Sequence, residues 1–279
     1  MRSKANRVSV VTGASRGVGK GVAIALASKG DTVYVTGRKM EGEKDSLEAT
    51  VKEINRRGGK GIAVACDHRY DQQTEAVFQK VKEDEGCLDI LVNNAFIIHE
   101  ELVSGKSFWD KPISVWNMID VGLRSSYIAS VFAAKIMVEQ QSGLIVNISA
   151  FGGGKYRHDV VYGVGKAGTD RLAIDMAVEL RPYNVASVSL WLGMVATEMT
   201  LKVFENPSEG FAEFKLENGE SPEFPGLIID ALADDPGLMQ RTGKVLISAE
   251  LGLEYGLEDI DGHQPESLRS KLGGPVWND

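Results

Sequence analysis

Short runs rich in β-branched residues alternate, along most of the chain, with longer stretches in which apolar residues return every three or four positions. The first pattern is typical of buried strands and the second of helices with one apolar face. Regular alternation of the two favours a parallel sheet covered by helices on both faces. The predicted strands are Arg7–Thr12, Thr32–Thr36, Gly61–Cys66, Leu88–Asn93, Gly143–Ser149, Val185–Leu190 and Lys244–Ser248. The predicted helices are Gly19–Lys29, Glu43–Arg57, Asp71–Glu83, Ile113–Glu139 and Val160–Leu180.

The residues that end and connect these elements predict one continuous domain. Gly30, Gly58 and Gly86 follow the first three helices, as expected where a helix ends in left-handed backbone. The sequence contains no internal repeat, low-complexity tract or Ser/Gly linker. We therefore expect residues 1–279 to form a single doubly wound α/β domain with a seven-stranded parallel sheet and helices on both faces. Within it, residues 194–225 are long and irregular, which is typical of a substrate lid, and residues 250–279 form a C-terminal tail.

Composition narrows the class of protein. The formal net charge of -8 argues against binding to nucleic acid or to an anionic membrane surface. The two cysteines, Cys66 and Cys87, form no CxxC pair, so we expect no disulfide framework and a reducing compartment. The N-terminal residues lead directly into the first strand without a signal peptide, and we expect no membrane span. These features predict a cytoplasmic protein.

A glycine-rich segment joins the first predicted strand to the first helix. Glycines there permit positive φ and let the backbone approach a pyrophosphate, and free N–H groups at a helix start attract phosphates. A glycine-rich turn without a ligand is the alternative. The strand-turn-helix context favours a dinucleotide site formed by Thr12, Gly13, Ser15, Arg16, Gly17, Val18 and Gly19.

Tyr162 and Lys166 are the main candidates for proton transfer. Because they are four residues apart on a predicted helix, their side chains share one face, where an ammonium can stabilise a phenolate. A free tyrosine has a pKa of about 10, and lowering it by about 3 units needs about 4 kcal/mol of preferential stabilisation. Of the 7 tyrosines, only Tyr162 has a lysine four places later, and Ser149 ends a predicted strand 13 residues before it. Taken singly, each residue has an ordinary structural explanation, but together they favour catalysis.

With these motifs the chain resembles the short-chain dehydrogenase/reductase family, over nearly its whole length. The resemblance implies a Rossmann domain and hydride transfer between a nicotinamide dinucleotide and a carbonyl or alcohol. It also implies that Ser149 holds the carbonyl oxygen and that Tyr162 gives its proton to the nascent alkoxide. The family usually has Pro-Gly where this chain has Leu192-Gly193, after Trp191. Further implied contacts are Asp67 with the adenine, Asn93 and Ala95 with the ribose, and Val195 and Thr197 with the nicotinamide amide.

The end of the second strand bears on the choice of cofactor. NAD enzymes usually place an acid there for the ribose hydroxyls, but this chain has Thr36-Gly37-Arg38. Arg38, together with Arg16, can clamp a 2′-phosphate through charge-assisted hydrogen bonds, which favours NADP(H), with NAD(H) possible. The alternative is that Arg38 pairs with a surface acid such as Glu41 or Glu43.

Four shorter stretches point to a narrower group within the family. The chain resembles dehydrogenase/reductase SDR family member 1 proteins, which implies steroid or other carbonyl substrates. That group can carry an apolar C-terminal extension; this chain ends at Gly273–Asp279, so we expect no membrane association from it. The stretches are Phe108-Trp109, Val121–Arg124, Tyr162–Ala167 and Tyr255–Gly262.

Asp120 occupies the position where we expect the family's asparagine, which helps to bridge Lys166 through water. An ionised aspartate can only accept hydrogen bonds, and it would favour the ammonium while opposing a tyrosinate. Alternatively Asp120 points elsewhere, or Asn117 fills the role. The four histidines, His68, His99, His158 and His263, show no metal spacing and are expected in surface loops, although His158 could line the mouth of the pocket.

The oligomeric state and two alternative functions remain to be considered. The apolar content of Ile113–Glu139 and Val160–Leu180 predicts a homodimer or homotetramer. A sugar-nucleotide epimerase or dehydratase shares the Tyr-x-x-x-Lys pattern but typically needs a larger C-terminal domain. A non-catalytic dinucleotide sensor would need no proton-transfer residues.

Overall fold

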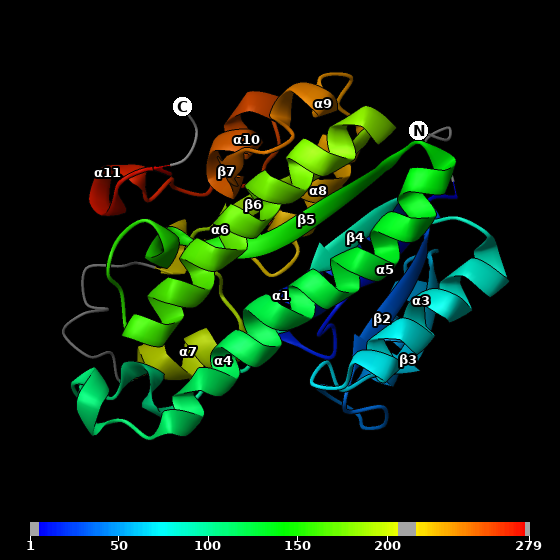
Figure 1. Ribbon diagram of the computed structural model, residues 1–279. Coiled ribbons are helices and arrows are strands. Elements are labelled where there is room, and N and C mark those ends of the chain that lie inside the picture. Colours follow the sequence, from blue (N-terminus) through cyan, green and yellow to red (C-terminus); the bar gives the residue numbers. More distant parts are fainter. Residues whose placement is uncertain (1–5, 206–215, 277–279) are drawn as a thin grey trace.

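Seven parallel strands form a single sheet in the order β3-β2-β1-β4-β5-β6-β7 (Figure 1). The computed structural model describes residues 6–205 and 216–276. The order reverses between β1 and β4, as in a doubly wound domain, and this confirms the predicted fold. Every strand lies within two residues of its predicted bounds: β1 Val8–Val11, β2 Thr32–Gly37, β3 Lys60–Ala65, β4 Ile90–Asn93, β5 Gly143–Ala150, β6 Val185–Leu192 and β7 Val245–Ile247.

Helices cover both faces of the sheet. On one face α1, α2 and α8 pack over a core that includes Val22, Ile54 and Ile228. On the other, α3, α5 and α6 pack over a core that includes Phe78 and Met137, and α5 and α6 cross the front of the sheet in Figure 1. The helices are α1 Gly17–Leu26, α2 Leu47–Arg56, α3 Asp71–Glu85, α4 Asn117–Ile119, α5 Ser125–Gln140, α6 Val160–Leu180, α7 Glu198–Glu205, α8 Phe224–Asp234, α9 Leu238–Arg241, α10 Ser248–Tyr255 and α11 Arg269–Leu272.

The predicted helix Ile113–Glu139 is interrupted. A 3-10 turn, Ile113–Trp116, precedes α4, and a π-turn over Asp120–Arg124 separates α4 from α5. A π-turn inserts one residue without breaking the helix axis, so apolar periodicity alone does not reveal it. Its consequence for the site is that Gly122 faces the interior beside Lys166.

The stretch Ile113–Gln140 is long and apolar enough to cross a membrane, judged by length and composition alone. One such stretch is a weak indication, because helices of a folded core pass the same criterion. Here 44% of its most apolar window is buried in the fold.

The predicted lid and tail are joined by hydrogen bonds. Within 194–225 the structure contains α7, a 3-10 turn over Leu216–Asn218 and the start of α8; residues 206–215 lie outside the described ranges, as do 277–279 of the tail. Ser221 donates both its backbone N–H and its hydroxyl to Asp259, at 2.6 Å each. The His263 ring lies 2.8 Å from the Gly219 carbonyl oxygen, so the tail supports the base of the lid.

Candidate active site

The glycine loop is held against the end of β4. The Thr12 hydroxyl accepts the backbone N–H groups of Asn94 and Ala95 at 2.9 and 3.0 Å. The Asn94 amide donates to the carbonyls of Thr12 and Gly13 at 2.8 and 3.1 Å. A methyl group on Gly13, whose φ is +67°, would lie 2.8 Å from Cα of Ala95, and one on Gly19 would lie 2.3 Å from the Asn94 amide nitrogen. Only glycine fits at these two positions.

The start of α1 faces the base of the lid. The backbone of Arg16 caps this helix without a side-chain hydrogen bond, and its first turn contains no acidic residue. Gly17 has a φ of +55° and lies against Thr197, whose Cγ2 would be 3.6 Å from an added methyl group. The structure therefore brings Thr197 next to the glycine loop, although Leu192 replaces the family's proline. Val195 is buried beside it and bridges to Glu220.

Arg38 is exposed where β2 ends, close to Asp67 after β3. Its charge lowers the pKa of Asp67, after the larger effect of the hydrogen bonds from Arg69. Among residues 6–205 and 216–276, Arg38 makes no ion pair with Glu41 or Glu43. Ser15 lies near Gly37, since a methyl group added to Gly37 would be 3.8 Å from Cβ of Ser15. The guanidinium is thus available beside the glycine loop.

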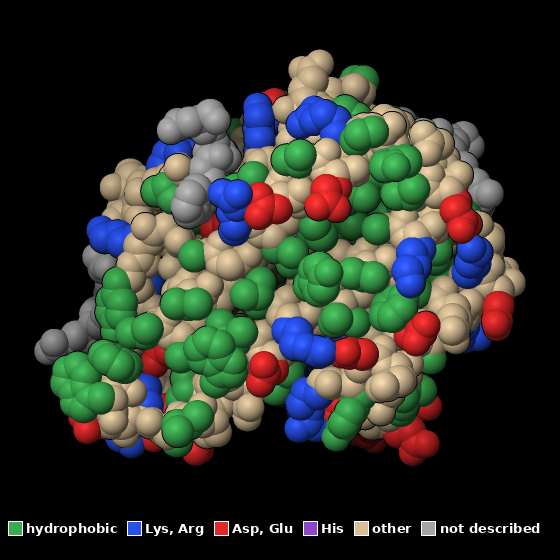
Figure 2. Space-filling model, in the orientation of Figure 1, with side chains coloured by type: hydrophobic (Ala, Val, Ile, Leu, Met, Phe, Trp, Pro, Cys, Tyr) green, Lys and Arg blue, Asp and Glu red, His purple; other side chains and the backbone are tan. Residues whose placement is uncertain are grey.

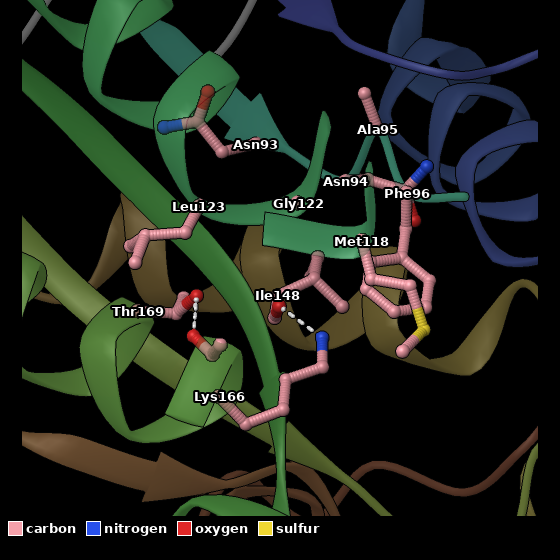
Figure 3. Close-up of a pocket in the computed structure, with 11 residues that line it drawn as sticks. Asn93, Asn94, Ala95, Phe96, Met118, Gly122, Leu123, Ile148, Lys166 and Thr169 are labelled. Atoms are coloured by element: carbon pink, nitrogen blue, oxygen red, sulfur yellow. Dashed lines mark hydrogen bonds between the residues drawn. The ribbon is translucent and has the colours of Figure 1, made fainter. Parts of the chain in front are cut away.

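Helix α6 carries the proton-transfer candidates, and its bounds match the prediction. Asp159 caps it, accepting the Val161 N–H at 2.7 Å, and also pairs with Lys111 at 2.5 Å. Lys166 donates to the Ile148 carbonyl at 3.1 Å (Figure 3). Burial lowers the pKa of Lys166 to about 8, although the charge of Asp170 opposes this.

Tyr162 is half-buried between aromatic neighbours. Its ring meets Phe96 edge-on at 6.2 Å between centroids and His158 at 5.5 Å. Gly152 leaves room for it, because a methyl group there would lie 2.5 Å from Cε1 of the tyrosine. Burial raises the pKa of Tyr162 to about 12, so the phenol is protonated at neutral pH. His158 therefore lies against the Tyr162 ring, as expected if it lines the mouth of the pocket.

Ser149 lies beside Lys166 at the end of β5. Its hydroxyl donates to the Lys166 carbonyl at 3.3 Å and also hydrogen-bonds Asp170. Asp170 is buried and accepts from the Ser189 hydroxyl at 2.6 Å and from the Trp191 indole at 3.0 Å. Burial raises the pKa of Asp170 against the lowering effect of these donors. Sequence reasoning missed Asp170, although it continues the four-residue spacing of Tyr162 and Lys166.

A small cavity of about 10 Å³ lies behind the Lys166 side chain (Figure 3). Room of this size suits about one water molecule. Its lining includes Met118, Gly122 and Phe96, but Asp120 is not among the described residues that form it. In this segment Gly122 lines the cavity and Asp120 does not, which agrees with the alternative that Asp120 points elsewhere.

The side-chain amide of Asn93 donates to Ser130 and Asn147 in the core, each at 2.9 Å, which leaves the Asn93 backbone for the predicted ribose contact. The expected surface position of one histidine is wrong. His68, expected at the surface, is only 6% exposed and lies 2.7 Å from the Thr36 hydroxyl. Burial lowers the pKa of His68 to about 4. The loop that follows a strand can be buried by neighbouring elements, and the local sequence pattern does not show this.

The described groups fit a nicotinamide dinucleotide. The glycine cradle and the uncapped start of α1, with Thr197 beside it, suit a pyrophosphate. Among residues 6–205 and 216–276, no cluster of three or more His, Cys, Asp or Glu side chains is placed to hold a metal ion. Cys66 and Cys87 are both buried, and neither forms a disulfide within the described residues.

Comparisons with known proteins agree with this geometry. Residues 7–208 match the family described as short chain dehydrogenase. Dehydrogenase/reductase SDR family member 1 of Mus musculus is 44% identical over 266 residues, covering 92% of this chain and 84% of the relative. The Homo sapiens protein of that name is 41% identical over 287 positions, covering 97% and 90%.

Solved structures show the same architecture. A short-chain type dehydrogenase/reductase from Mycobacterium marinum has a TM-score of 0.76 at 27% identity and covers 87% of this chain and 94% of its own. An actinorhodin polyketide ketoreductase variant with NADPH has a TM-score of 0.74 at 26% identity, covering 87% and 95%. Sequence, fold and site thus agree: the chain belongs to the short-chain dehydrogenase/reductase family, whose oxidoreductases bind a nicotinamide dinucleotide and act on small molecules.

Proposed function

We propose that this protein transfers hydride between NADP(H) and a carbonyl or alcohol, as a carbonyl reductase, with Ser149, Tyr162 and Lys166 as its proton-transfer site. The observation that carries the proposal is that these three residues lie together. The Ser149 hydroxyl donates to the backbone carbonyl of Lys166, and the Lys166 ammonium lies on the same helix face as Tyr162, 6.0 Å from the centre of its ring.

Reduction is the direction that the resting site favours. When bound, the nicotinamide supplies or accepts the hydride. With its pKa raised to about 12, Tyr162 holds the proton that a nascent alkoxide needs. For oxidation, the tyrosine must instead lose this proton, which the Lys166 ammonium promotes. The Ser149 hydroxyl can turn from Lys166 to hold the carbonyl oxygen.

The preference for NADP(H) rests on Arg38. The guanidinium is exposed after β2 and, within the described ranges, forms no ion pair with Glu41 or Glu43. A guanidinium binds phosphate oxygens in bidentate geometry. The NADPH-bound ketoreductase of similar fold is consistent with this choice.

The surroundings favour an apolar substrate, such as a steroid or xenobiotic ketone. Phe96 and His158 pack against Tyr162, and an apolar cavity of about 210 Å³ lies beside the N-terminus of α6, between Phe108, Trp116 and Val161. Segment 194–225, which contains Thr197 and ends at the start of α8, would act as the substrate lid within a single domain of residues 1–279. We place this activity in the cytoplasm.

A homodimer or homotetramer is also part of the proposal. Apolar side chains are exposed along the outer face of α5 and α6, including Tyr127, Val164 and Val178, and Figure 2 shows apolar groups across this face. Exposed apolar patches commonly mark association surfaces. Light scattering that detects only a 30.2 kDa species at micromolar concentration would contradict it.

A substrate screen tests the activity directly. A panel of steroid, aromatic and aliphatic ketones is incubated with NADPH or NADH, and reduced-nicotinamide absorbance is followed. We expect turnover with apolar ketones and faster turnover with NADPH. Binding of NADPH without consumption across the panel would favour a dinucleotide sensor instead.

A further inference from the structure

The charge of Lys166 is finely balanced. Burial lowers its pKa to about 8, close to a neutral working pH, and within the described residues the ammonium donates one hydrogen bond, to the Ile148 carbonyl. A neutral amine could not stabilise a tyrosinate. Any neighbour that favours the ammonium therefore affects the proposed chemistry.

Phe96 offers such an interaction from the loop that follows β4. The Lys166 ammonium nitrogen lies 5.0 Å from the centre of the Phe96 ring, within the range of a cation–π interaction. The same ring meets Tyr162 edge-on, so Phe96 contacts both ends of the proposed pair. Figure 3 shows the Lys166 amine extending toward Ile148, with Phe96 beside it.

Gly122 makes room for this ring. A methyl group added to Gly122 would lie 2.7 Å from Cδ2 and 3.0 Å from Cε2 of Phe96. Real Cβ atoms essentially never approach so closely, and the π-turn presents this backbone to the interior. A side chain at this position would push the ring away from Lys166.

We propose that Phe96 is a positioning residue, which holds the Lys166 ammonium beside Tyr162 through the face of its ring, and that Gly122 allows the ring to lie there. The proposal rests on the proposed function, in which that ammonium assists Tyr162. In the part of the chain that the structure describes, the titratable groups that face Lys166 are Tyr162 and Asp170, both on α6. The cavity residues from β4 and the loop after it, from the π-turn and from β5, such as Asn94, Leu123 and Ile148, carry no titratable side chain.

The direct test is the titration of Lys166 in the full-length protein without cofactor. Isotope-labelled lysine side chains are followed by NMR against pH, with the Lys166 signal assigned by its loss in Lys166→Arg. Phe96→Leu should lower the pKa of Lys166 by about 0.5–1.5 units, whereas Phe96→Tyr, which keeps the ring face, should restore it. Phe132→Leu is the matched control, because the Phe132 ring lies 5.1 Å from the exposed Lys135 and should leave Lys166 unchanged.

Gly122→Ala tests the same contact without changing the ring. It should lower the pKa of Lys166, and adding it to Phe96→Leu should produce no further shift, because both changes remove one interaction. If Phe96→Leu does not fold, trifluorophenylalanine at position 96 keeps the shape and removes the attraction of the ring face. An unchanged Lys166 titration in the folded Phe96 variants would overturn the proposal.

Catalysis provides a second readout. In Phe96→Leu, the acid limb of the alcohol-oxidation profile should move to higher pH, because a more weakly held ammonium stabilises the Tyr162 phenolate less. A wild-type protein that turns over no ketone would overturn the proposed function, while the NMR titration would still decide the role of Phe96. A loss of kcat with no movement of the limb or of the titration would assign Phe96 a packing role and reject the positioning role.

Discussion

Replacing Gly17 by alanine separates cofactor binding from folding. Gly17 has a φ of +55°, and an added methyl group would lie 3.6 Å from its nearest neighbour. Gly30 has a φ of +88° with nothing within 4 Å of such a group. Both substitutions place an L side chain in left-handed backbone without a clash, at a cost of about 1–2 kcal/mol each. We expect each to lower the Tm of the cofactor-free protein by about 2–8 °C.

Only Gly17 lies where the backbone would approach a pyrophosphate. Gly17→Ala should therefore weaken NADPH binding at least about tenfold, or about 1.4 kcal/mol, and Gly30→Ala should leave it unchanged. Fluorescence titration with NADPH and thermal unfolding of the same samples measure the two effects. Wild-type affinity in Gly17→Ala would refute the assignment of the glycine loop. A much larger loss of Tm in Gly17→Ala than in Gly30→Ala would show that the loop mainly serves the fold.

Three further substitutions follow from the site. Arg38→Ala should weaken NADPH far more than NADH, and an equal loss of both affinities would contradict the NADP assignment. Asp120→Asn should leave the pH–rate profile unchanged, because Gly122 faces Lys166; a shift of the oxidation profile toward lower pH would return Asp120 to the relay. Burial raises the pKa of Glu220 from 4.5 to about 7, so its contribution to stability is complete below pH 4.5 and is lost as pH rises through 7. Denaturant unfolding should show a loss of about 3 kcal/mol from this group between pH 4.5 and 8 that Glu220→Gln removes, and an identical pH dependence in the variant would count against it.

Local patterns predicted the strands because each is short, β-branched and bounded by turn residues. Helix α6 was also predicted correctly at both ends, since Asp159 provides a recognisable cap. The predicted helix Glu43–Arg57 begins instead at Leu47, because the Ser46 hydroxyl accepts the Ala49 N–H and starts it there. Several residues before this helix could serve as its N-cap, and the sequence alone did not show which of them does.

Part of the site could likewise be predicted from the sequence, and part could not. Tyr162 and Lys166 were found from their spacing on one helix, and the structure places Ser149 beside them. Phe96 contacts Lys166 only because the loop after β4 lies against α6, and no local period relates the two residues. The interior role of Gly122 depends on the π-turn, whose extra residue changes which side chain faces inward.

Tyr162→Phe tests the central claim most directly, because it removes one hydroxyl and keeps the ring between Phe96 and His158. Single-turnover reduction of a good ketone with bound NADPH should slow by about 100-fold or more, while NADPH affinity and Tm stay close to wild type. A rate within a few-fold of wild type would show that Tyr162 is not the proton donor.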